Sequence, residues 1–330
     1  MKRRSSIKVG LAIAGLGASL LSGGLVQAQT YPSQPVRIVV PFAAGGATDI
    51  IARLVAEKLS QRMGGSFIVE NRGGASGIVG TQVVQQAKPD GYTLLLTGNG
   101  PHAVNVALFG KLPHDPLRDF AQISLTGVLP LVLNANPGAP VRTLDDFVKW
   151  AKAQPGKASY ASPGIGSPPH LSMELLAQAH GLSLVHVPYK GSAPAIADLI
   201  AGHVPVMFDN VLASIQNIRA GRIRSLAVGS LERLESLPEV PTFAESGMKG
   251  FQVATWTALV APAGTPAAIT ERLSGEVRAI FALPDVKERL QQQGAIPTTM
   301  TPAETARFVG EEITKWQRVA EAAKVPKVDR

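Results

Sequence analysis

The sequence contains no cysteine among its 330 residues. This absence excludes disulfides, thiolate metal sites and a lipidated N-terminal cysteine. Charged residues are scarce at 17%, and basic residues form no run with interleaved aromatic side chains, so the chain carries no nucleic-acid footprint. Hydrophobic residues make up 45%, which is typical of a globular protein, and the length allows two domains.

Motifs of common enzyme classes are also missing. The sequence has no G-x-S-x-G nucleophile elbow, no G-x-x-x-x-G-K-[ST] phosphate loop and no H-E-x-x-H zinc motif. The glycines of segment 74–80 are three residues apart and do not match the G-x-G-x-x-G pattern of dinucleotide folds. The six histidines show no metal-ligand spacing. We therefore predict neither a metal nor a cofactor.

The only long apolar run of the sequence lies at its N-terminus and predicts an export signal. A basic segment, 2–8, precedes an apolar segment, 9–26, and Val26-Gln27-Ala28 supplies small residues for cleavage after Ala28. An uncleaved membrane anchor is the alternative, but glycine and serine interrupt the run and it is short for a span. Removal of the four basic residues of this leader leaves 28 Lys+Arg against 24 Asp+Glu, a net charge of +4. We expect an exported, periplasmic protein.

Segment 36–53 combines a strand, a glycine turn and the start of a helix. The β-branched run 36–40 predicts a buried strand, and Gly45 and Gly46 permit a turn that a ligand can approach closely. Thr48 or Asp49 is expected to cap the following helix. A helix that begins behind a glycine turn offers unpaired N–H groups to an anion, although an ordinary strand-to-helix turn has the same pattern.

The same alternation continues along the chain. Further strands are predicted at 66–70, 93–97, 128–133, 159–162, 184–187, 204–208 and 225–228, separated for the most part by helices, among them 78–87 and 143–153. This order predicts parallel sheets whose ligand loops gather at the carboxyl ends of the strands. A strand at 255–260 is expected to return to the first sheet, followed by helices near 266–283, 284–293 and 302–323. Glycine, serine, threonine and asparagine at strand ends suit a small polar anion bound between two lobes.

Several motifs together resemble one family. They are Pro41-Phe-Ala-Ala-Gly-Gly-Ala-Thr-Asp49, Asn71-Arg-Gly-Gly-Ala-Ser-Gly77, Pro89-Asp-Gly-Tyr-Thr-Leu-Leu95, Tyr160-Ala-Ser-Pro-Gly-Ile-Gly-Ser167 and Val187-Pro-Tyr-Lys-Gly-Ser-Ala-Pro194. The chain resembles the Bug (TctC-like) family, the periplasmic solute receptors of tripartite tricarboxylate transporters. The resemblance covers the whole mature chain in order, and it departs at Gly73 and Ser76, where the family more often has proline and glycine.

The resemblance implies an α/β fold of the type II periplasmic-binding-protein (Venus-flytrap) class, with two lobes and two crossover strands near Gly127 and Thr255. After a signal peptide at 1–28, lobe 1 would comprise residues 29–127 and 255–330, and lobe 2 residues 128–254. It also implies a carboxylate ligand held in the cleft by main-chain groups, hydroxyls and ordered waters, without a cationic clamp. Dicarboxylates, tricarboxylates, amino acids and aromatic acids all fit this description.

The resemblance also assigns expected ligand-binding residues. From the first glycine turn they are Phe42, Ala44, Gly45, Gly46, Ala47 and Thr48, and from the opposite side Ser162, Gly164, Gly166, Ser167 and His170. Thr97, Asn99, His102, Tyr189 and Asp209 are expected at the far end of the cleft, where they would set selectivity.

The expected function is a monomeric receptor that delivers its carboxylate to integral-membrane transporter subunits. A ligand-sensing receptor that signals to a sensor protein, without a permease of its own, is an alternative. A periplasmic hydrolase with Ser167 as nucleophile and His170 as base is a second alternative, against which the sequence offers no orienting acid. We expect no enzymatic activity.

Overall fold

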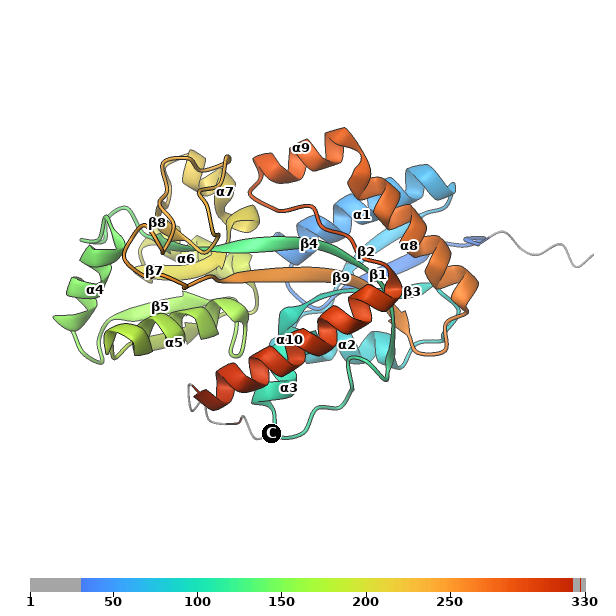
Figure 1. Ribbon diagram of the computed structural model, residues 1–330, viewed down its shortest axis with the longest axis horizontal. Helices are drawn as coiled ribbons and strands as arrows, with labels where there is room; N and C mark the ends of the chain where they lie inside the picture. The colour runs from blue at the N-terminus through green and yellow to red at the C-terminus, as the bar shows by residue number, and fades with distance from the viewer. Residues whose placement is uncertain (1–30, 323–326, 328–330) are drawn as a thin grey trace, which may run out of the picture.

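The computed structural model describes residues 31–322 and 327, so the predicted export signal lies outside the described residues. The molecule is a two-lobed α/β protein in which two long strands, β4 and β9, run side by side between the lobes (Figure 1). Elements from the start and the end of the chain share one lobe, and the middle of the chain forms the other. No helix of the described residues is long and apolar enough to cross a membrane.

The first lobe is built on a parallel sheet, as the strand–helix alternation predicts. Its elements are β1 (Val36–Val40), α1 (Ala47–Met63), β2 (Phe67–Asn71), α2 (Ile78–Gln85) and β3 (Thr93–Gly98). β1 lies between β2 and β3 and pairs with both in parallel. Helices cover both faces, since Ile38 packs in one apolar cluster with α1 and α8 while Val39 packs in another with α2 and α10.

The crossing strands are longer than the sequence predicts. β4 (Phe120–Ala135) pairs with β9 (Ala254–Pro262) up to Pro130, and from Leu131 onward it pairs with β7 and β8. The predicted strand 128–133 therefore covers only part of the second half of β4. β9 also pairs with β3, which confirms that the late strand returns to the first sheet.

The second lobe continues the alternation. Its elements are α4 (Leu144–Lys152), β5 (Ser159–Ser162), α5 (Pro168–His180), β6 (Val185–Pro188), α6 (Ser192–Ala201), β7 (Val206–Asn210), α7 (Val211–Arg219) and β8 (Arg224–Val228). β5 pairs in parallel with β6 and β7, and the whole sheet runs in the order β2-β1-β3-β9-β4-β7-β5-β6, with β8 on β4. Thr143 caps α4 through a capping box with Asp146, which confirms that predicted helix start.

The C-terminal helices return to the first lobe. α8 (Ala267–Ala282), α9 (Pro284–Gln292) and α10 (Pro302–Ala322) lie within two residues of their predicted bounds. α8 packs beside α1, and α10 packs across α3 and β4. The sequence did not predict the short helices η1 (Ala75–Gly77), η2 (Gly100–Val104) and α3 (Asn105–Leu108). Glycine and proline favour a turn in η1 and η2, and α3 has only four residues.

Candidate functional site

The glycine turn after β1 leads directly into α1. Gly46 is the N-cap of this helix, with φ −81° and ψ 168°, and no side chain of the described chain caps it. The expectation that Thr48 or Asp49 caps α1 is therefore wrong. The Asp49 carboxylate instead accepts hydrogen bonds from the main-chain N–H of Gly45 and from the side chains of Arg53 and Asn71. Burial opposes ionisation of Asp49, but these bonds outweigh it and lower its pKa.

A cavity of about 60 Å³ lies at the end of this turn, between the two lobes. Its walls are made mainly of turns and helix starts from both sides of the molecule. They comprise Phe42, Gly46, Ala47, Thr48, Gly98, Asn99, Gly100, Pro163, Ser167, Pro168, Pro169, Gly191, Ser192, Asn210, Thr255 and Trp256.

Four α-helices begin at this cavity. The N-cap residues of α1, α5, α6 and α7, which are Gly46, Ser167, Gly191 and Asn210, all line it. No described side chain caps α1, α6 or α7, so their first N–H groups are left for a ligand. Each helix also directs the positive end of its dipole to the same place. The cavity is therefore built to stabilise negative charge.

Asn99 adds an unused donor to this wall. Its side chain is 2% exposed, and its Nδ2 group has no hydrogen-bond partner among the described residues. A buried amide N–H without an acceptor is costly, and such groups are rare in folded proteins. An anionic ligand in the cavity would supply the missing acceptor.

Charged side chains are absent from the described lining of the cavity. The basic residues of the neighbouring segments lie elsewhere: Arg53 and Arg72 form ion pairs with Asp49 and Glu70, and Lys190 is exposed. Recognition of an anion here therefore depends on helix N-termini, hydroxyls and amides, as the sequence indicates.

A hydrogen-bond network orders the polar groups of the far wall. Thr255 donates its hydroxyl to Oδ1 of Asn210 at 2.6 Å, which leaves the amide Nδ2 of Asn210 as a donor. Ser192 Oγ donates to Oδ1 of Asp209 at 2.7 Å. Asp209 is fully buried and does not itself line the cavity.

The two lobes touch around the cavity. Ser76 Oγ donates to the carbonyl oxygen of Ile165 at 2.5 Å, which joins the second glycine turn to the start of α5. A Cβ built on Gly191 would lie 3.1 Å from Cβ of Ala43, and one on Gly45 would lie 3.4 Å from Cβ of Ala193. These short distances show that the two lobes approach each other closely around the cavity.

The structure brings six of the expected site residues into the lining: Phe42, Gly46, Ala47, Thr48, Asn99 and Ser167. Ala44 and Gly45 are exposed beside it on the same turn. Ser162, Gly164, Gly166 and His170 lie behind the start of α5. There Ser162 Oγ accepts from the Gly164 N–H, and Nδ1 of His170 accepts from the Gly166 N–H.

The remaining expected residues lie away from the cavity wall. Thr97 Oγ1 and His102 Nδ1 are 3.0 Å apart inside the first lobe, where burial lowers the pKa of His102 to about 3. Tyr189 donates its hydroxyl to Asp198 at 2.6 Å. Asp209 lies one hydrogen bond behind the cavity, beyond Ser192.

Ser167 and His170 do not form a nucleophile–base pair. Ser167 Oγ accepts from the main-chain N–H of His170, as an N-cap does, and His170 Nδ1 accepts from Gly166. The imidazole stacks on His186 with ring centroids 4.0 Å apart, and burial lowers its pKa to about 4. A general base needs a hydrogen bond to the nucleophile, and these contacts direct Nδ1 elsewhere.

Some lining residues are missing from the sequence prediction. Gly191, Ser192 and Asn210 lie at or shortly after strand ends, where glycine, serine and asparagine are expected to suit an anion, so this pattern could also have found them. Pro163 belongs to the motif Tyr160–Ser167, and Pro168 and Pro169 follow it directly. Thr255 and Trp256 carry no local signal, because only the return of β9 to the centre of the sheet brings them to the cavity.

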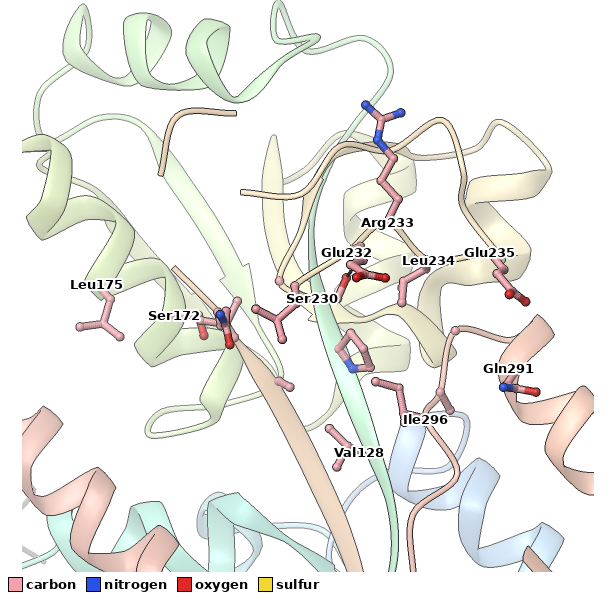
Figure 2. Close-up of a pocket in the computed structure, with 18 of the residues that line it drawn as sticks. Val128, Ser172, Leu175, Ser230, Glu232, Arg233, Leu234, Glu235, Gln291 and Ile296 are labelled. Atoms are coloured by element: carbon pink, nitrogen blue, oxygen red, sulfur yellow. Dashed lines mark hydrogen bonds between the residues drawn. The ribbon is translucent and has the colours of Figure 1, made fainter. Parts of the chain in front are cut away.

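A larger cavity, of about 740 Å³, shares no lining residue with the first. Figure 2 shows Ser172 and Leu175 of α5 on one side, Gln291 and Ile296 on the other, and Glu232 and Glu235 on the loop above. Its charged lining residues balance, because Arg233 and Lys315 accompany Glu232 and Glu235, and the helix end that reaches it is the C-terminal end of α9. Its lining is mostly apolar, and no helix starts there among the described residues.

Comparisons with known proteins agree with this geometry. Residues 51–325 match the family model described as "Tripartite tricarboxylate transporter family receptor". Protein BugT of Bordetella pertussis is 38% identical over 314 residues, covering 95% of this chain and 94% of BugT. Two solved structures from Rhodopseudomonas palustris are also similar. Rpa4515 with adipate has 36% identity and a TM-score of 0.88, covering 90% of this chain and 100% of that one. MatC with bound malate has 34% identity and a TM-score of 0.82, covering 88% and 99%.

Proposed function

Because this chain belongs to the receptor family of the tripartite tricarboxylate transporters, we propose that it captures a small carboxylate in the cavity between its lobes. The family consists of periplasmic solute-binding receptors. The receptor would deliver its ligand to integral-membrane transporter subunits, or, as the alternative, report it to a sensor protein. We propose that it acts as a monomer and has no enzymatic activity.

The observation that carries this proposal is the convergence of helix N-termini on a cavity without cationic side chains. The unpartnered Nδ2 of Asn99 is a second, independent feature that fits an anion. Main-chain N–H groups at helix starts bind carboxylates and phosphates in many proteins. Their dipoles compensate the ligand's charge without a long side chain that must be ordered on binding.

The proposed contacts follow from the lining. The N–H groups at the starts of α1 and α6 would bind one carboxylate, with hydroxyls of Thr48 and Ser167 and the amide of Asn99 around it. The relatives with adipate and with malate make dicarboxylates the first class to test. His102, Thr97 and Tyr189 would lie behind the residues that contact the ligand, because each forms a hydrogen bond with another side chain.

We propose that the lobes meet near Gly127 and Thr255 and that the ligand favours the closed arrangement. Gly127 has φ +136° and follows a register shift in the pairing of β4 with β9, which suits a flexible joint. A ligand that contacts both walls stabilises the closed state, since the open state offers it only one wall. Lobe 1 would comprise 29–127 and 255–330, and lobe 2 would comprise 128–254.

We also propose that the protein is exported and that its signal peptide is cleaved after Ala28. Val26 and Ala28 are small enough for the positions that a signal peptidase reads. N-terminal sequencing of protein recovered from the periplasm tests this cleavage.

A thermal-shift screen tests the receptor function. The protein from Gln29 onward is unfolded and refolded to remove any bound solute, then heated with malate, adipate, citrate and the fully methylated esters of the same acids. A ligand at one hundred times its dissociation constant adds about 2.7 kcal/mol to the free energy of unfolding, enough for a clear rise in melting temperature. A shift with an acid but not with its ester supports the proposal. Equal shifts with acid and ester, or no shift with any acid, would contradict it.

A further inference from the structure

Asp209 lies directly behind the cavity wall with a fully buried side chain. Its Oδ1 accepts from Ser192 Oγ at 2.7 Å and from the main-chain N–H of Asn210 at 2.8 Å. Its Oδ2 has no hydrogen-bond partner among the described residues. Both donors belong to residues that line the cavity, so one hydroxyl group separates this carboxylate from the ligand's space.

No cation of the described chain compensates Asp209. β4 and β5 beside β7 carry no charged residue, and β4 places Val132 opposite Asp209. The titratable groups on the helices packed against β7 are His170, Glu174 and His180 of α5, Asp198 of α6 and Arg219 of α7. Asp198 bonds to Tyr189 and His203, Glu174 bonds to Tyr160, and Arg219 bonds to the carbonyl of Gln292.

An incoming carboxylate would therefore meet a second negative charge across Ser192. Both anions would compete for the N-terminal dipoles of α6 and α7. Two carboxylates that share such a site favour protonation of one of them. We infer that Asp209 is a positioning residue that takes up a proton when a carboxylate enters the cavity, so that ligand capture is coupled to proton uptake. This inference rests on the proposed function and adds its regulation by pH.

The hydrogen bond to Ser192 explains how the proton would help binding. An ionised Asp209 holds the Ser192 hydrogen toward itself, so the serine presents only lone pairs to the cavity. When a proton from solvent adds to the Asp209 carboxylate, the new O–H group can donate a hydrogen bond to Ser192 Oγ. Ser192 then turns its own hydrogen to the ligand carboxylate. No other bond forms or breaks.

Burial supports this assignment, because it raises the pKa of Asp209 to about 7 in spite of its two hydrogen bonds. The group is then partly ionised near neutral pH, and a small unfavourable charge suffices to protonate it. His170 and His186 do not interfere, since burial lowers the pKa of each to about 4.

Titration calorimetry with malate and adipate tests the coupling. The dissociation constant of the wild type should rise about tenfold between pH 6 and pH 8, because the empty receptor must first bind a proton. Measurements at pH 8 in phosphate and in Tris, whose ionisation enthalpies differ, should show uptake of about one proton per ligand.

The variants isolate the carboxylate. Asp209→Asn keeps the acceptor and imitates the protonated group, so its affinity should not change with pH and it should take up no proton. Asp198→Asn changes a half-buried carboxylate on the same helix as Ser192 and should keep the wild-type pH dependence. If Asp209→Asn does not fold, Ser192→Ala should show less proton uptake than the wild type at pH 7, because its Asp209 loses a stabilising donor and is already protonated.

The outcomes separate the two proposals. Binding of malate or adipate without pH dependence, or with equal dependence in Asp209→Asn, overturns the proton coupling alone. A protein that binds neither acid at any pH overturns the receptor function for this ligand class, and the coupling with it.

Discussion

Replacement of Asn99 by leucine should change stability and ligand binding in opposite directions. The buried Nδ2 of Asn99 has no acceptor in the described structure, so the unliganded protein carries the cost of an unmade hydrogen bond. That cost is about 1–3 kcal/mol, and leucine keeps the branched shape without the donor. The melting temperature of the empty variant should therefore rise by about 2–4 °C for each kcal/mol that is relieved.

Ligand binding should weaken in the same variant. A hydrogen bond from an amide to a carboxylate contributes about 1.5–3 kcal/mol, so the dissociation constant for the acid found in the screen should increase about 10- to 150-fold. Differential scanning calorimetry of the stripped protein gives the first quantity, and titration calorimetry gives the second.

Ser274→Ala is the matched control. Ser274 lies in α8, is 1% exposed, and its Oγ also has no partner among the described residues. This variant should gain stability without any change in ligand affinity. If Asn99→Leu bound the acid as tightly as the wild type, the unused donor would not serve the ligand and the reasoning would be refuted.

Three further predictions concern closure, pH and the fold. Gly191→Ala should bind the acid more than tenfold more weakly, because Gly191 has φ +139° and the added Cβ would press on Ala43 across the cleft. Gly275→Ala is the control: nothing lies within 4 Å of its added Cβ, so it should bind normally in the same calorimetric assay. Asp209 has a folded pKa of about 7 against an ordinary 3.8, so the folded state holds its proton more tightly and loses stability as pH rises through this range. In urea unfolding, the free energy of unfolding of the wild type should fall between pH 5 and pH 8 by about 2–3 kcal/mol more than that of Asp209→Asn. Equal losses in both proteins would contradict this prediction. Thr143→Ala should cost about 1 kcal/mol in the same unfolding assay, since it removes the capping box of α4, and ligand affinity should not change.

The sequence by itself determined the local elements of this protein. β-branched runs, glycine turns and helix stop signals act over a few residues, so the starts and ends of α4, α5 and α8 follow from their own segments. The scarcity of cations and the glycine and hydroxyl residues at strand ends also indicated main-chain recognition of an anion. These properties depend on residue type and spacing alone.

Only the tertiary structure decided which of these elements meet. Thr255 reaches Asn210 because β9 returns to the middle of the sheet, a pairing between segments far apart in the sequence. His102 and Asp209 lie near the ends of β3 and β7, as Asn99 and Asn210 do, yet packing turns them inward. A residue's position in a strand or turn fixes its spacing, whereas its neighbours depend on how distant segments pack. The convergence of four helix starts on one cavity is therefore a property of the fold, and it gives the individually ordinary turns their capacity to bind an anion.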